Sequence, residues 1–154
     1  PLYRDRWDEV PPGMAPWYRL AVFHCHKYYF SASIEPTYIG SAHRFDDVPE
    51  MTPEQKEAMQ FSQSLSEELR FDTGLNRGDM QFCNNHVIFH TRRAFEDFED
   101  PSRKRHLLRL WLKAHDGRPL PAAFYERHGT VETVDRPGGI VGEDTILNAP
   151  LEWT

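Results

Sequence analysis

One stretch, residues 78–112, constrains the fold of this chain more than any other. It holds two short apolar runs, 80–90 and 105–112, which are joined by a polar and highly charged connection. Short runs rich in aromatic, branched and leucine residues are typical of β-strands. The first run is interrupted at Asn84, Asn85 and His86, which indicates a tight turn or a bulge. We therefore predict two neighbouring strands, the second of them covered on both faces.

The same two runs carry the side chains that most suggest chemistry. His90 ends the first run, and a neutral imidazole is a ligand for first-row metals. Arg105 and Arg109 are four residues apart, which puts both guanidinium groups on one face of a strand. A guanidinium grips a carboxylate through two hydrogen bonds, so an external dicarboxylate is the favoured partner. Unpaired buried charge is costly, and the run contains no acidic residue, which also favours an external partner. A structural network with aspartate or glutamate is the alternative.

Five short motifs of this stretch form a set: Gly78-Asp79, Asn84-Asn85-His86, His90-x-Arg92, Ala94-Phe95-x-Asp97 and the run from Arg105 to Leu112. Together they resemble the C-terminal half of the TauD/TfdA-like family of Fe(II)- and 2-oxoglutarate-dependent dioxygenases. The resemblance continues upstream and covers most of residues 1–120. It implies a double-stranded β-helix, or jelly-roll, that is mainly β with helical additions. The chain would be the C-terminal part of this fold.

The resemblance also implies roles for individual residues. His90 would be the distal histidine of the iron site, and therefore both a metal ligand and a catalytic residue. Arg105 and Arg109 would hold the carboxylates of 2-oxoglutarate, with Fe(II) as cofactor and O2 as the second cosubstrate. Asn85 and Arg92 are candidates for contacts with substrate or with the ligand sphere. A plain turn residue and a solvent-exposed arginine are the alternatives for these two positions.

The family's proximal iron ligands form a His-x-Asp or His-x-Glu pair, and the sequence contains no such pair. The nearest triplets, His24-Cys25-His26 and His43-Arg44-Phe45, lack the carboxylate. We therefore expect the C-terminal portion of a longer dioxygenase, inactive alone, that hydroxylates a small anionic organic substrate. The alternatives are a shortened homologue that has lost its iron and a non-catalytic jelly-roll module that binds a small carboxylate.

Local signals elsewhere predict a hairpin and a helix. Residues 17–34 are rich in aromatic and branched residues around a polar centre at His24, His26 and Lys27, which indicates two strands and a tight turn. The two histidines are either an incomplete metal site or half-exposed turn residues. Thr52 is the predicted N-cap of a helix that begins at the following proline. Its apolar stripe, expected to cover a sheet, consists of Ala58, Phe61, Leu65 and Leu69.

Composition narrows the function classes. The chain has 154 residues and a net charge of −6, so the basic footprint of a nucleic-acid-binding protein is missing. No apolar run approaches the ~18 residues of a membrane span. Two distant cysteines, Cys25 and Cys83, suggest buried free thiols and a reducing, cytoplasmic location. We expect a single domain with a partly ordered tail at 130–154 and a small-molecule substrate; a homo-oligomer is left open.

Overall fold

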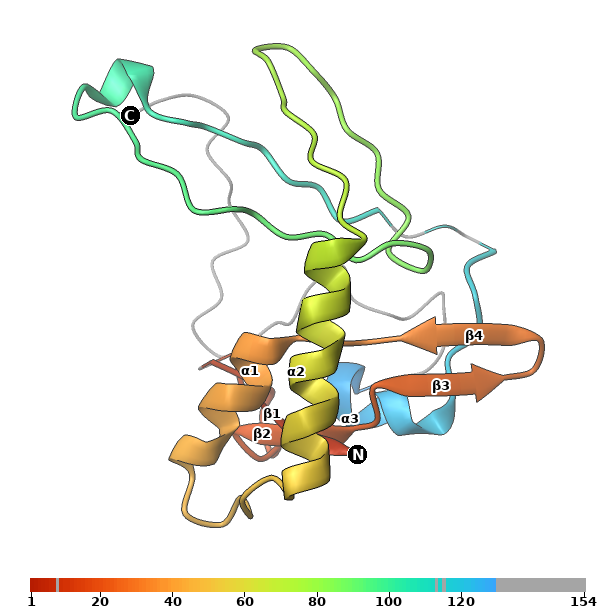
Figure 1. The fold of residues 1–154 in the computed structure, drawn as a ribbon. Helices are drawn as coiled ribbons and strands as arrows, with labels where there is room; N and C mark the ends of the chain where they lie inside the picture. Colours follow the sequence, from red (N-terminus) through yellow and green to blue (C-terminus); the bar gives the residue numbers. More distant parts are fainter. Residues whose placement is uncertain (8, 113, 115, 130–154) are drawn as a thin grey trace.

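The fold was analysed in a computed structural model, which describes residues 1–7, 9–112, 114 and 116–129 (Figure 1). All strands in these residues lie near the N-terminus: β1 (Leu2–Asp5), β2 (Trp17–Leu20), β3 (Phe23–His26) and β4 (Tyr29–Ala32). The helices are α1 (Pro36–Ser41), α2 (Pro53–Glu68) and α3 (Tyr125–His128), with 3-10 turns at Ala42–Arg44, Pro101–Arg103 and Ala122–Phe124. The mixture of strands and helices agrees with the expected β fold with helical additions, although the described residues do not close a jelly-roll.

The core lies between the first sheet and the end of the described chain. β1 pairs with β2 in antiparallel register, with Leu2 opposite Leu20. Tyr18 and Leu20 alternate with outward residues on β2, so both point to the same side and are buried. They pack with Leu120 and Phe124, which return from about a hundred residues further along the chain. This long-range packing fixes α3 against the first sheet.

A buried arginine crosses this core. Arg4 is 0% exposed and donates to the carbonyl oxygens of Leu20 at 2.5 Å and Ser33 at 2.7 Å. Its Nε lies 3.2 Å from Glu35, whose other carboxylate oxygen lies 2.7 Å from Arg127. Loss of solvent lowers the pKa of Arg4. The charged side chains of Arg4 and Asp5 in β1 are thus internal.

The predicted hairpin is confirmed as β3 and β4, which pair in antiparallel register with His26 opposite Tyr29. Lys27 takes the positive φ of 53° that the tight turn requires. Nε2 of His24 donates to the carbonyl oxygen of Ala21 at 2.9 Å, and the centre of its ring lies 4.8 Å from that of the Phe124 ring. His24 therefore packs against the core, and nothing in the described residues makes the His24–His26 pair a metal site.

The predicted helix is confirmed, but its predicted packing is wrong. Thr52 accepts a hydrogen bond from the backbone of Gln55, whose side chain accepts one from the backbone of Thr52. This reciprocal capping box starts α2. The expected stripe does not cover a sheet: Phe61 is 67% and Leu69 72% exposed. No helix in the described part of the chain is long and apolar enough to cross a membrane.

The two strands predicted at 80–90 and 105–112 are absent: residues 70–112, all described, contain no strand and are exposed (Figure 1). An isolated strand leaves its backbone donors and acceptors unpaired, so apolar composition alone does not form one. The turn within the first run is present, because Val87 and Ile88 donate to the carbonyl of Asn84 at 2.9 and 3.2 Å.

Two further expectations concern the thiols and the tail. Cys25 and Cys83 are free but exposed, so the expected burial of their thiols is wrong. The predicted tail at 130–154 lies outside the described residues.

We expect Arg4→Met to lower the free energy of unfolding by about 3 kcal/mol, because it leaves buried carbonyl oxygens without a donor. Chemical denaturation measures the change. Arg19→Met, at an exposed position of the neighbouring strand, is the control and should change stability by less than about 1 kcal/mol. Equal losses in the two variants would contradict the structural role of Arg4.

Candidate functional site

His90 and Asn85 are brought together by the turn that begins at Asn84. The carbonyl of Asn84 accepts from two later backbone N–H groups, and its side-chain Oδ1 accepts from the N–H of His86 at 3.0 Å. The chain therefore folds back, and Nε2 of His90 lies 3.0 Å from Oδ1 of Asn85. A carbonyl oxygen only accepts, so Nε2 of His90 is the donor in this contact. Both side chains are exposed.

Arg92 and Arg105 are brought together by a loop that Asp97 closes. Oδ1 of Asp97 accepts from the backbone N–H groups of Phe98 at 3.0 Å and Arg105 at 2.9 Å. This contact returns the chain towards Phe95. The guanidinium carbon of Arg92 then lies 5.0 Å from the centre of the Phe95 ring, and that of Arg105 lies 5.2 Å from it.

Arg109 contacts a different ring. Its guanidinium carbon lies 5.7 Å from the centre of the Trp111 ring. Without a strand at 105–112, the even spacing of Arg105 and Arg109 does not place them on a common strand face. In the part of the chain that the structure describes, no hydrogen bond, ion pair or ring contact joins His90 to either arginine. The proposed roles of these three residues stay predictions.

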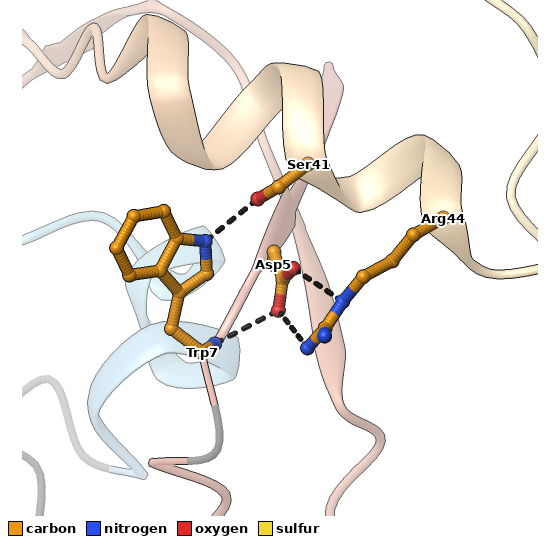
Figure 2. Close-up of a pocket in the computed structure, with 4 residues that line it drawn as sticks. All are labelled: Asp5, Trp7, Ser41 and Arg44. Carbon is orange, nitrogen blue, oxygen red and sulfur yellow. Dashed lines mark hydrogen bonds and ion pairs between the residues drawn. The ribbon is translucent and has the colours of Figure 1, made fainter.

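A second candidate site, missed by the sequence analysis, lies between β1 and α1 (Figure 2). Asp5, 1% exposed, accepts from the backbone N–H of Trp7 at 2.8 Å and forms an ion pair with Arg44 at 2.8 Å. The Trp7 indole donates to Ser41 Oγ at 2.7 Å. These four residues line a cavity of about 290 Å³.

The backbone of this second site is strained. Trp7 has a φ of 48°, a left-handed conformation that costs a bulky residue on the order of 1–3 kcal/mol. The two hydrogen bonds of Trp7, together with its ring contact to Tyr38 at 5.1 Å, hold that conformation. A buried aspartate and a left-handed tryptophan leave no sequence pattern that distinguishes them from a charged loop, which explains why this site was missed.

An apolar cavity of about 330 Å³ lies under the first half of α2. Its walls come from α2, the N-terminus and the chain between β2 and β3, and include Leu2, Val22, Ala58 and Met59. It contains no titratable side chain among the residues that line it. It therefore offers volume and apolar contact, but no acidic or basic side chain and no histidine or cysteine.

Comparison with known proteins identifies the protein family to which this chain belongs. Residues 2–111 match the family described as "Taurine catabolism dioxygenase TauD, TfdA family", and the chain belongs to this family. The predicted resemblance is thereby confirmed. FR-33289 synthase from Streptomyces rubellomurinus (strain ATCC 31215) is 30% identical over 145 residues, which are 88% of this chain and 41% of that protein. The chain thus spans about two fifths of the length of this curated relative. No solved structure matches it significantly.

Members of this family are dioxygenases that use Fe(II), 2-oxoglutarate and O2. The described residues of this chain do not form an iron site by themselves. Among them, no group of three or more His, Cys, Asp or Glu side chains could hold a metal ion. The ring of His90 contacts Asn85, an amide, and arginine side chains are cationic and bind no metal.

We expect Asn85→Ala to shift the tautomer ratio of His90 towards that of free histidine by about two- to tenfold, because a net hydrogen bond of about 1 kcal/mol is lost. Nitrogen-15 NMR of the imidazole measures the ratio. Asn85→Asp keeps an accepting oxygen and should retain the Nε2–H tautomer. Identical spectra for the alanine variant and the unsubstituted protein would contradict the contact.

Proposed function

We propose that this chain supplies the distal histidine and the arginines of an Fe(II)- and 2-oxoglutarate-dependent dioxygenase. The observation that carries the proposal is the family match, which runs through His90, Arg105 and Arg109. The reaction would be the hydroxylation of a small, anionic organic substrate, with O2 and 2-oxoglutarate as cosubstrates. The name of the relative, FR-33289 synthase, supports a small molecule as the substrate.

The proposed contribution of this segment is binding and orientation. His90 would offer one ring nitrogen to iron, while Asn85 holds the other ring nitrogen in place. Arg105 and Arg109 would bind and orient the carboxylates of 2-oxoglutarate, with which a guanidinium forms charge-assisted hydrogen bonds. The oxidation itself needs further ligands that the described residues lack. The described part is thus the anion-binding half of the proposed site.

The two exposed free thiols support a reducing compartment and hence the cytoplasm as the proposed location. The net charge of −6 supports a small-molecule partner over a nucleic acid.

The test uses the native protein that carries this chain, supplied with Fe(II), O2 and 2-oxoglutarate. We expect succinate to form. Arg105→Ala and Arg109→Ala should each weaken 2-oxoglutarate binding about 10- to 100-fold, the effect of losing a charge-assisted hydrogen bond of about 1.5–3 kcal/mol. Isothermal titration calorimetry measures the affinity, and succinate release measures turnover.

Arg103→Ala is the matched control, because Arg103 lies in the same segment and packs on Phe98 instead of Phe95. It should leave the affinity within about twofold. Binding of 2-oxoglutarate without succinate formation would favour the non-catalytic carboxylate-binding module. Unchanged affinity in both arginine variants would refute their role in cosubstrate binding.

A further inference from the structure

The guanidinium groups of Arg92 and Arg105 both contact the ring of Phe95. With Arg92 at 5.0 Å and Arg105 at 5.2 Å from the centre of the ring, the two guanidinium carbons lie within about 10 Å of each other. The ring is 45% exposed, so solutes reach the groups around it. Each guanidinium presents planar N–H donors that match a carboxylate. Two guanidinium groups that can each bind a carboxylate therefore contact the same apolar ring.

The carboxylate of Asp97 closes the loop that brings Arg92 and Arg105 to Phe95, and it does so through hydrogen bonds to the backbone. Asp97 accepts the backbone N–H groups of Phe98 and Arg105 through Oδ1, so its contact is with the backbone and not with a guanidinium. Asp100 likewise accepts from the backbone and the hydroxyl of Ser102. These two aspartates therefore shape the loop, and their contacts are not with the guanidinium groups of Arg92 and Arg105.

The neighbouring arginines behave differently. Arg93 pairs with Asp72 at 3.1 Å, and Arg70 also lies 3.5 Å from Asp72. Within the described residues, no carboxylate forms an ion pair with Arg92 or Arg105. Two cations within about 10 Å of each other repel, and an anion near both relieves that repulsion. The charge pattern thus points to an external anion at this pair.

We infer that Arg92 is the guanidinium that acts together with Arg105 in binding the dicarboxylate, on the Phe95 platform. This assignment rests on the proposed function for the identity of the ligand, 2-oxoglutarate. It changes the expected pairing of Arg105 with Arg109, because Arg109 packs on Trp111. Arg92 is therefore a cosubstrate-binding residue, and Arg109 contacts the cosubstrate independently of this pair.

The experiment compares adjacent arginines in the native protein that carries this chain. The affinity for 2-oxoglutarate is measured by calorimetry without turnover, so the result does not depend on iron chemistry. Arg92→Ala should weaken binding about 10- to 100-fold, and Arg92→Lys, which keeps the charge but loses the fork, by less. Arg93→Ala removes the same charge one residue away and should stay within about twofold.

A double-mutant cycle tests the pairing itself. Arg92→Ala and Arg105→Ala should be non-additive, because either one breaks the shared site, whereas Arg92→Ala and Arg109→Ala should be additive. Phe95→Leu removes the platform and should weaken binding several-fold, while Phe98→Leu should not. Circular dichroism confirms that each variant folds.

The outcomes separate the two hypotheses. Loss of affinity in Arg92→Ala with no succinate from the unsubstituted protein would keep the arginine pair and reject the dioxygenase. Succinate formation with equal affinities in Arg92→Ala and Arg93→Ala would keep the dioxygenase and reject the pair. If inorganic phosphate displaced 2-oxoglutarate as well as another dicarboxylate does at the same concentration, the proposed pair would also be rejected. The two guanidinium groups would then recognise negative charge alone.

Discussion

The buried guanidinium of Arg4 is the interaction on which the N-terminal part of the fold depends. It reaches the end of β2 through Leu20 and the end of β4 through Ser33. Through Glu35 it meets Arg127 of α3, although Glu35 and Arg127 are far apart in sequence. An internal charge is tolerated only when its hydrogen bonds are satisfied and its partner is close. One side chain therefore positions both hairpins and the returning helix.

Sequence signals predicted the elements whose causes are local. The capping box at Thr52 and Gln55 and the hairpin turn at Lys27 depend on neighbouring residues, and both are present. The strand β1 was not predicted, because its charged residue Arg4 is buried by groups that are distant in sequence, and no local pattern shows this. The strands expected at 80–90 and 105–112 failed for a related reason. Apolar composition needs partner strands, and these are absent from the described residues.

The candidate site was predictable at the level of family and residue type, but not of contact. The motifs around His90 and Arg105 identified the family. The spacing of Arg105 and Arg109 suggested a shared face only on the assumption of a strand, and the structure instead joins Arg105 to Arg92 at Phe95. That contact depends on the loop closed by Asp97, whose length is not a periodic signal. The Asp5–Trp7 cavity depends on tertiary burial and left no signal at all.

Helix α2 connects the N-terminal part of the chain, which contains buried residues, to residues 70–112, which are exposed. Its first half meets the apolar cavity through Ala58, Met59 and Ser62, whereas Phe61 and Leu69 face solvent. In Figure 1 the segment with His90 and the arginines extends beyond its C-terminal end. Within the described residues, helix α2 is thus in contact with the N-terminal core through its first half. The N-terminal core therefore sets where this segment is attached, and it leaves the large apolar side chains of the segment exposed.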